Sequence, residues 1–190
     1  DDTLGLGVDA DADAVAAARP QDGPRLHRRR ADQWHATLCF LGHDLLHLVT
    51  PALLDAFAAM RKGVENARLL LVGEGVLFDE IRAKAARLGL EKDVIFYGAS
   101  NGVGKLMQAM DLLALPSRFE GLPVVGVEAQ AAGLPVLFSD RITRQAELTD
   151  HVRFLPIDRM SVEEWGEAAR EVAEGPGWDR AEDCERVRAA

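Results

Sequence analysis

Two glutamates in an otherwise apolar stretch are the residues whose type and spacing could do chemistry. Glu120 and Glu128 stand eight positions apart in RFEGLPVVGVEAQAAGLPV, residues 118–136. Eight residues counted along a helix span about 12 Å, whereas the two carboxyl groups of a retaining glycosidase lie about 5 Å apart. The spacing therefore argues against a general acid paired with a carboxylate nucleophile.

The same spacing suits two hydrogen-bond acceptors that hold the two ends of one elongated ligand. Pro123 favours a helix start between the two glutamates, and the unpaired N–H groups of a helix N-terminus bind phosphate. Acceptor, anion site and acceptor is the order that a sugar nucleotide requires for its hexose, diphosphate and ribose. On spacing alone, two surface glutamates, one of them near a helix N-terminus, account for the pattern equally well.

Apolar runs and amphipathic stretches alternate from about residue 37 onward and must position these glutamates. We expect strands at 37–42, 67–73, 93–98, 111–116, 135–139 and 152–157, and helices at 50–63, 76–89, 103–110, 123–132 and 161–175. Ser161 and Glu164 have the spacing of a capping box at the start of the helix expected at 161–175. Gly133 can end the helix expected at 123–132. Continuously apolar strands that alternate with helices indicate a parallel sheet covered on both faces. The predicted fold class is α/β, a doubly wound parallel sheet of the Rossmann-like type, which binds ligands at the carboxyl ends of its strands.

The loops at those carboxyl ends hold further candidates. Gly73 and Gly75 form a G-x-G turn, but Phe78 stands where a dinucleotide fingerprint has its third glycine, so a plain tight turn is an equal alternative. The stretch GASNGVGKL, residues 98–106, lacks the glycine and the Ser or Thr that a P-loop requires, and we reject a nucleoside-triphosphate hydrolase. Gly98 instead fits a sharp turn at a strand end.

Composition narrows the function classes. The chain of 190 residues is 48% hydrophobic and 28% charged, with a net charge of −9. The negative charge argues against a nucleic-acid partner, because phosphate backbones require a basic face. Cys39 and Cys184 match no metal-ligand spacing and suit a reducing cytoplasm. No apolar run approaches the roughly 20 residues of a membrane span, and no signal peptide is visible.

At these motifs the sequence resembles a known family. The resemblance is carried, in order, by LLLVGEG, VIFYG, DLLALPSRFEGLPVVGVEAQAAGLPV and SDRITRQAEL. These motifs resemble the C-terminal, nucleotide-sugar-binding domain of retaining GT-B glycosyltransferases of group 1, also called family four. The hallmark of that family is two glutamates separated by seven residues, here Glu120 and Glu128. The stretch SDRITRQAELTDHVRFLPI resembles the bacterial capsular and exopolysaccharide branch, and the likeness covers residues 50–173.

The resemblance implies a role for each residue of the glutamate loop. Glu120 is the catalytic candidate and contacts hydroxyls of the donor sugar in the implied site. Gly121 and Leu122 supply backbone amides near the diphosphate. Glu128 accepts hydrogen bonds from the ribose diol, which a carboxylate can bind with two charge-assisted bonds.

The remaining donor-binding candidates lie on the neighbouring loops. Gly73, Gly75 and the segment after Gly98 line the donor cleft in the implied site, the last of these near the base. Arg118 and Ser139 complete the donor-binding set. The expected donor is a UDP-sugar. No cofactor and no metal are expected, because cationic side chains and helix amides hold the diphosphate in this family.

The sequence departs from the family where an Arg and a Lys usually grip the diphosphate. The matching stretch contains His43 and His47 but no Arg or Lys, and neutral His is a poor substitute near pH 7. Both histidines also fit ordinary surface positions at a helix start. Arg118, Arg141 and Arg144 lie on other cleft loops, and we hypothesise that they compensate.

The chain divides into three parts. Residues 1–36 are irregular and resemble a remnant of an interdomain segment, residues 37–175 are the donor-binding domain, and residues 176–190 are a C-terminal tail. The acceptor-binding half of a GT-B enzyme is missing, so a truncated form that is inactive alone is expected. The Arg/His/Pro mix of residues 20–48 suggests a frameshifted translation, which reading the coding DNA in all three frames would test.

Two functions from different classes remain open. The first is a hexosyltransferase donor domain that passes a sugar with retention to a polysaccharide or lipid-linked acceptor. We expect this donor domain to lie in the cytoplasm. One alternative is that it also contacts the inner face of the membrane through its acceptor. The second is a non-catalytic nucleotide-sugar-binding or interaction module that works with a separate partner chain. The apolar face of the helix at 161–175 could serve such a partner, although packing on its own sheet fits better; its residues are Trp165, Ala168, Ala169 and Val172.

Overall fold

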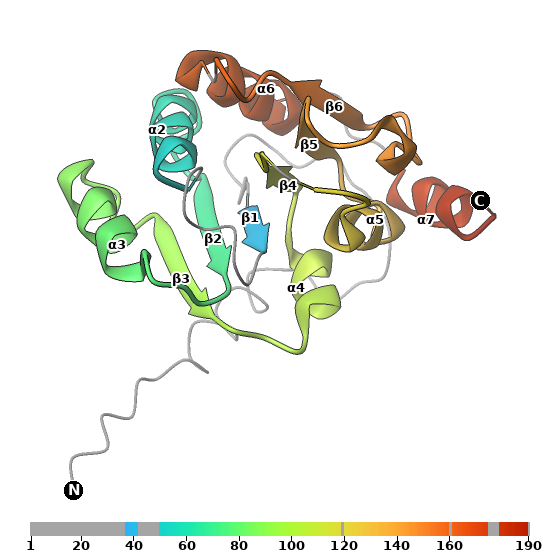
Figure 1. Cartoon of the computed structure of the whole chain (residues 1–190), viewed down its shortest axis with the longest axis horizontal. Helices are drawn as coiled ribbons and strands as arrows, with labels where there is room; N and C mark the ends of the chain where they lie inside the picture. The colour runs from blue at the N-terminus through green and yellow to red at the C-terminus, as the bar shows by residue number, and fades with distance from the viewer. Residues whose placement is uncertain (1–36, 42–49, 119, 160, 175–178, 190) are drawn as a thin grey trace, which may run out of the picture.

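A computed structural model gives the arrangement of the chain (Figure 1). It describes residues 37–41, 50–118, 120–159, 161–174 and 179–189. His43 and His47 lie outside the described residues, as does the segment 1–36, and the expectations attached to them stay predictions.

The described elements follow the alternation that the sequence predicts. They are β1 (Thr37–Leu41), α2 (Thr50–Arg61), β2 (Arg68–Val72), α3 (Phe78–Arg87), β3 (Val94–Gly98), α4 (Val103–Ala109), β4 (Leu112–Leu115), α5 (Val124–Ala131), β5 (Val136–Ser139), the 3₁₀ turn η2 (Arg144–Ala146), β6 (Val152–Leu155), α6 (Val162–Glu174) and α7 (Arg180–Ala189). Each strand and helix expected from the sequence is present, and its ends differ from the expected ones by at most two residues.

The six strands among the described residues form one parallel sheet in the order β3-β2-β1-β4-β5-β6. This order is that of the Rossmann fold, and the chain reverses direction across the sheet between β1 and β4. The predicted doubly wound α/β class is therefore confirmed. In such sheets the crevice outside the carboxyl ends of the two strands at the reversal is the usual ligand site.

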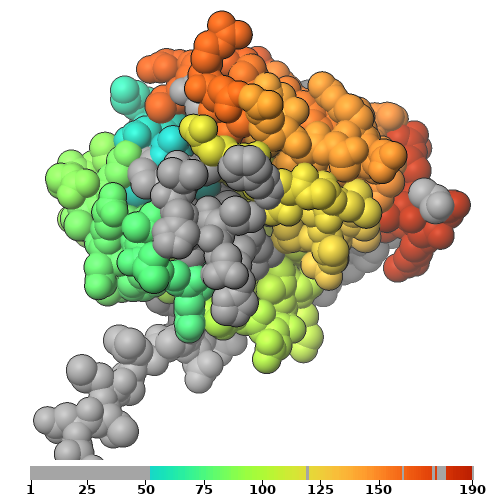
Figure 2. All heavy atoms as spheres, viewed as in Figure 1, coloured from blue at the N-terminus to red at the C-terminus, as the bar shows by residue number. Residues whose placement is uncertain are grey.

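Helices cover both faces of the sheet. Helices α2, α3 and α6 lie on one face, with α2 packed on α6, while α4, α5 and α7 lie on the other, with α5 packed on α7 (Figure 1). In the space-filling view, the yellow surface of the α5 region borders the lime-green surface of α4 and the orange surface of the residues after β5 (Figure 2). None of the helices in the described ranges has both the length and the apolar character that a membrane span requires.

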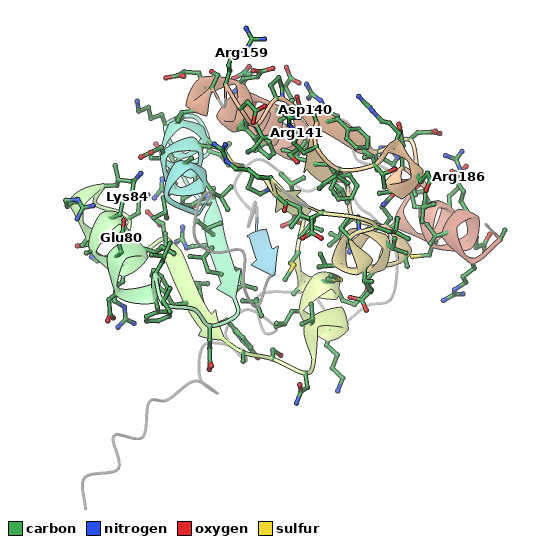
Figure 3. All side chains as sticks on the ribbon, in the orientation of Figure 1. Glu80, Lys84, Asp140, Arg141, Arg159 and Arg186 are labelled. Atoms are coloured by element: carbon green, nitrogen blue, oxygen red, sulfur yellow. The ribbon has the colours of Figure 1, made fainter. Side chains whose placement is uncertain are left out.

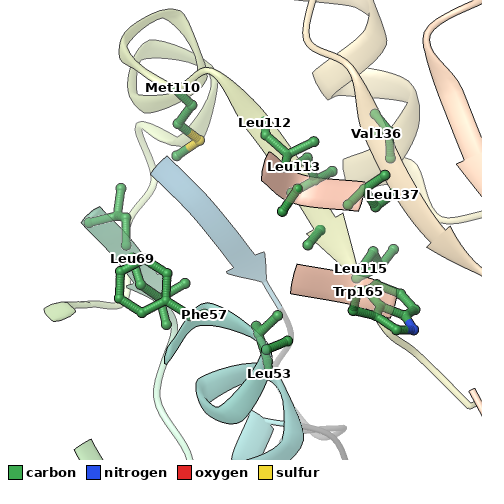
Figure 4. Packing of buried hydrophobic residues seen from close by; sticks show 14 of the residues in the cluster. Leu53, Phe57, Leu69, Met110, Leu112, Leu113, Leu115, Val136, Leu137 and Trp165 are labelled. Carbon is green, nitrogen blue, oxygen red and sulfur yellow. The ribbon is translucent and has the colours of Figure 1, made fainter. Parts of the chain in front are cut away.

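The core between the helices and the sheet is built from aliphatic side chains and a few aromatic ones. Leu53 of α2 lies on the side of Trp165 of α6, and Phe57 of α2 lies beside Leu69 of β2 (Figure 4). Trp165 is almost fully buried and donates its indole N–H to the carbonyl of Pro156 at 3.1 Å. The apolar face of α6 thus packs inside the domain, as the sequence favoured, and a partner is not needed to cover it.

Two helix ends form as their local signals predict. The hydroxyl of Ser161 accepts a hydrogen bond from the amide of Glu164 at 3.1 Å, which is the cap expected at the start of α6. Gly133 has a φ of 69° after the end of α5, and the amide of Leu134 returns to the carbonyl of Ala129 at 2.9 Å.

The segment predicted as a C-terminal tail, 176–190, contains helix α7, which the apolar pattern did not reveal. Its residues are mostly polar, and it is held by contacts with distant residues rather than by an apolar stripe. Arg180, at its first position, donates hydrogen bonds to carbonyls at the ends of α4 and α5. The folded domain therefore extends to the end of α7.

Candidate functional site

The predicted site residues come together at the carboxyl edge of the sheet. Gly73 follows β2, Gly98 ends β3, residues 116–118 and 120–123 follow β4, and Ser139 ends β5. Because all strands are parallel, their carboxyl ends meet at one edge. The loop after β1, which is the other side of the chain reversal, lies outside the described residues.

The segment between β4 and α5 brings polar groups to this edge. Ser117 is buried, whereas Glu120 is half-buried and Arg118 is exposed. Leu122 is 57% exposed.

Helix α5 begins without a side-chain cap. Its N-cap residue is Pro123, whose carbonyl accepts from the amides of Gly126 at 2.9 Å and Val127 at 3.2 Å. Within the described part of the chain, the amides of Val124 and Val125 have no hydrogen-bond partner. Two free amides at the positive end of a helix dipole form a site for an anion.

The two glutamates lie on either side of this helix start along the chain. Glu128 is on the second turn of α5 and exposed, as predicted, on the same side as Val124 one turn earlier. Glu120 lies in the loop before the helix, so only the four residues from Val124 to Glu128 follow the helical rise, about 6 Å. The separation of about 12 Å expected from an unbroken helix therefore does not describe the two glutamates. The chain order of acceptor, helix N-terminus and acceptor is the one that the sequence suggested.

Ser139 holds two segments of the site together. Its side chain is fully buried, and its hydroxyl donates to the carbonyl of Ser117. This bond ties the end of β5 to the loop that leads to Glu120. A direct contact between Ser139 and a donor stays a prediction, since in this structure the hydroxyl is bonded inside the protein.

The glycines after β2 and β3 shape the other side of the edge. Gly98 has a φ of 77°, a left-handed conformation that side chains disfavour, which confirms the sharp turn expected there. Its carbonyl accepts from the amide of Gly73 at 2.8 Å, so the two strand ends are tied together. The carbonyl of Gly75 accepts from the amide of Phe78 at 3.1 Å and opens α3. Val76, between them, is 79% exposed.

Two of the three arginines proposed to compensate for missing basic residues converge. Arg118 lies 3.8 Å from Asp158 Oδ1, and Arg141 pairs with the other carboxylate oxygen of Asp158. Arg141 and its neighbour Asp140 lie in the loop after β5 (Figure 3). Arg144 instead stacks on Phe154, with its guanidinium carbon 3.8 Å from the ring centroid. Arg118 and Arg141 therefore lie close together around one carboxylate, that of Asp158. Arg144 instead contacts Phe154 and does not join them.

Comparison with known proteins gives the family. Residues 36–189 match the family of glycosyl transferases group 1. The chain belongs to this family. The resemblance found in the sequence is thereby confirmed at the level of group 1 glycosyltransferases.

Curated relatives match this group 1 glycosyltransferase domain over short parts of their length. EpsF of Bacillus subtilis is 41% identical over 95 residues, which are 50% of this chain and 25% of EpsF. The Vi polysaccharide biosynthesis protein VipC/TviE of Salmonella typhi is 46% identical over 70 residues, 37% of this chain and 12% of its own. The D-inositol 3-phosphate glycosyltransferase of Segniliparus rotundus is 34% identical over 119 residues, 60% of this chain and 26% of its own. The chain thus spans about a quarter or less of these relatives.

Solved glycosyltransferases share the fold. WaaG, a glycosyltransferase involved in lipopolysaccharide biosynthesis, superposes with a TM-score of 0.71 and 24% identity over 93% of this chain and 46% of WaaG. Alr3699/HepE of Anabaena, in complex with UDP and glucose, gives a TM-score of 0.68 and 22% identity over 82% of this chain and 43% of HepE. The group 1 domain described here is therefore one Rossmann-like half of a GT-B fold.

One residue of this region escaped the sequence analysis. Gln130 of α5 is fully buried and bonds to the connection between β5 and β6. The sequence does contain a signal for this role: Gln130 is an amide side chain in the apolar stretch 124–136, and a buried amide needs hydrogen-bond partners. The expectation that no metal takes part in the site stays a prediction.

Proposed function

We propose that this chain is the donor-binding half of a group 1 glycosyltransferase and that it binds a UDP-sugar at the carboxyl edge of its sheet. The observation that carries the proposal is the uncapped N-terminus of α5, with Glu120 before it and Glu128 behind it, next to the reversal of strand order. A nucleotide sugar offers hydroxyl, diphosphate and hydroxyl in the matching order.

The diphosphate occupies the start of α5 in this proposal. The free amides of Val124 and Val125 donate to phosphate oxygens, and the helix dipole favours the negative charge. Arg118 lies on the same loop and adds a positive charge. When the bond between sugar and diphosphate breaks, negative charge grows on the diphosphate, so fixed donors here stabilise the leaving group.

The two carboxylates bind the two ends of the donor. Glu128 is exposed and accepts both hydroxyls of the ribose diol through charge-assisted bonds. Glu120, half-buried in the loop before α5, accepts from hydroxyls of the hexose and so orients its anomeric carbon. We propose transfer with retention, through positioning and leaving-group stabilisation rather than a covalent intermediate on either glutamate.

The relatives support the choice of donor and pathway class. HepE was solved with UDP and glucose, and VipC/TviE acts in the biosynthesis of the Vi polysaccharide. We propose a UDP-sugar donor and a polysaccharide or lipid-linked acceptor on that basis. The chain corresponds to 46% of WaaG, and we propose that transfer requires an acceptor-binding half opposite the edge described here.

Titration of the chain with UDP and UDP-sugars by isothermal calorimetry tests the proposal. Glu128→Ala removes the ribose acceptor and is expected to raise the dissociation constant about tenfold or more, the loss typical of a charged hydrogen bond. Glu91→Ala is the matched control, because Glu91 is exposed and precedes β3 at the opposite edge of the sheet. Absence of UDP binding, or equal Kd values for the two variants, would refute the proposed site.

A further inference from the structure

Helix α5 is apolar or small nearly all the way around. Of its residues VVGVEAQA, only Glu128 and Gln130 have polar side chains. A helix is normally held at one rotation about its axis because an apolar face opposes a polar face. Apolar character distinguishes the faces of α5 only weakly, so another interaction must fix which face points outward.

Gln130 provides this interaction. Its side chain is fully buried, and both ends of its amide group are bonded. Nε2 donates to the carbonyl of Ala146 at 2.7 Å and to that of Gly126 at 3.0 Å. Oε1 accepts from the amides of Leu148 at 2.8 Å and Thr149 at 3.1 Å. These bonds join α5 to the connection between β5 and β6.

The direction of Gln130 determines the direction of Glu128. Two residues along a helix correspond to a rotation of about 200°, so a helix that points Gln130 into the protein points Glu128 away from it. Glu128 is exposed, and so is Val124 on the same side. A rotation of α5 that broke the Gln130 bonds would turn Glu128. It would also leave the partly buried amide of Leu148 and the buried amide of Thr149 without partners, which is costly.

We infer that Gln130 is a positioning residue: by bonding to residues 146–149 it sets the rotation of α5 and thereby aims Glu128 and the first-turn amides at the ligand. This inference rests on the proposed function. Gln130 itself contacts no ligand and acts through Glu128. A buried polar residue that fixes the orientation of an otherwise apolar helix has the same physical role as a buried polar residue that fixes helix register.

Gln130→Met tests the inference, because it keeps the side-chain length and removes every hydrogen bond of the Gln130 amide group. Asp93→Asn is the control for loss of stability alone. Asp93 is a buried carboxylate at the opposite edge of the sheet, paired with Arg61 at 3.0 Å and Arg68 at 2.8 Å. Both full chains are titrated with UDP at a temperature at which circular dichroism shows them folded. We expect Kd to rise about tenfold in Gln130→Met and to stay unchanged in Asp93→Asn. Unchanged affinity in Gln130→Met, or equal losses in both variants, overturns the inference.

A double-mutant cycle separates positioning from general stability. In the Glu128→Ala chain, Gln130→Met is expected to cost little further affinity, because the group that it aims is gone. Full additivity of the two losses overturns the inference. If Gln130→Met does not fold, Gln130→Glu replaces it: the protonated carboxyl restores one donor, so UDP affinity should rise toward that of the wild type as the pH is lowered. A pH profile parallel to that of the wild type counts against the inference.

A ligand-free measurement keeps this test separate from that of the proposed function. If the wild-type chain binds no UDP, the proposed donor site fails on its own. Hydrogen exchange then decides: Gln130→Met is expected to speed exchange in α5 and in residues 146–149 and to leave β5 unchanged. Unaltered exchange in α5 overturns the inference.

Discussion

Gly126 of α5 lies directly against the ring of Phe138 of β5. A Cβ at position 126 would come within 2.5 Å of Phe138 Cε1, closer than real atoms pack. Phe138 is fully buried and lies 5.5 Å, centroid to centroid, from the ring of Phe154. It therefore has little room to move away. The absence of a side chain at Gly126 lets the first turn of α5, with its free amides, sit close on the sheet.

Gly126→Ala is expected to destabilise the fold by about 1–3 kcal/mol, the usual cost of overpacking a core. Thermal unfolding followed by circular dichroism measures the loss as a lower Tm. Gly104→Ala in α4 is the matched control, because an added Cβ there meets nothing within 4 Å. Alanine in a helix should stabilise that site by roughly 0.5–1 kcal/mol. Equal Tm values for the two variants would show that the α5–β5 contact is looser than described.

The elements around the site could be predicted because their signals are local. The apolar run of β4 followed by Pro123 placed the start of α5 within one residue, and Gly133 marked its end. Ser161 and Glu164 similarly marked the start of α6. The carboxyl-edge position of the candidate residues then followed from the parallel strand order alone.

The remaining features depend on contacts between segments that are far apart in the sequence. Nothing near Arg180 indicates that it bonds to Ala132, 48 positions away, so α7 looked like a tail. Ser139 looked like a residue facing a ligand, but its hydroxyl donates to Ser117, 22 positions earlier. The pairing of Arg118 with Asp158 likewise required the loops after β4 and β6 to be placed in space.

Arg180 closes the carboxyl-terminal ends of two helices. Its guanidinium donates to the carbonyls of Met107 at 3.1 Å and Met110 at 3.2 Å, and to that of Ala132 at 2.9 Å. Carbonyls at a helix end lack intrahelical partners and favour a cation. Arg180→Met is expected to lower the free energy of unfolding by about 2–3 kcal/mol, measured by urea denaturation.

Two further substitutions show whether the fork of the guanidinium is what matters. Arg180→Lys should restore little of the loss, since one ammonium cannot reproduce several diverging N–H donors. Arg188→Met, at an exposed position of α7, should stay within about 0.5 kcal/mol of the wild type. If Arg180→Lys instead retained the full free energy of unfolding, the positive charge of Arg180 alone, and not the shape of its guanidinium group, would account for its role.

In the proposed site, Asp158 would compete with an anionic ligand for Arg118 and Arg141, because its carboxylate faces both guanidinium groups. Asp158→Asn is expected to strengthen UDP binding about two- to threefold at low salt, the range of exposed ion pairs, with the gain fading at high salt. Calorimetry at two ionic strengths measures this. Glu171→Gln is the control, because it removes one negative charge as well and likewise leaves an arginine, Arg153, without its carboxylate partner. A similar gain in affinity in that control would mean that net charge alone causes the effect.

Donor binding is expected to need no divalent cation. In the proposed site the charge of the diphosphate is met by the amides of Val124 and Val125 and by Arg118, so chelation should leave the UDP affinity unchanged. Calorimetric titrations in EDTA and in Mg²⁺ provide the comparison. A marked loss of affinity in EDTA would mean that a metal ion supplies charge that the protein lacks.

Asp183 of α7 is expected to make the stability of the domain depend on pH. Burial raises the pKa of the Asp183 carboxyl above its ordinary value of 3.8, while His151 and Arg186 act in the opposite direction and Glu182 and Asp150 add to the rise. Among the residues that the structure describes, its Oδ2 has no hydrogen-bond partner, although His151 Nε2 lies 3.5 Å away. A carboxyl with a raised pKa binds its proton more tightly in the folded chain, so its ionisation costs stability as the pH rises through that pKa.

Asp183→Asn is therefore expected to raise Tm at neutral pH by about 3 °C, equivalent to about 1 kcal/mol for a chain of this size. The difference should shrink as the pH falls and vanish below 3.8, where the wild-type carboxyl is protonated in both the folded and the unfolded chain. Asp150→Asn is the control with the opposite sign, because the hydrogen bond from Arg186 lowers the pKa of Asp150. Removing the Asp150 carboxylate should lower Tm at neutral pH, and this effect should fade as the pH is lowered. A lower Tm for Asp183→Asn at neutral pH would show instead that the ionised carboxylate stabilises α7 through His151 and Arg186.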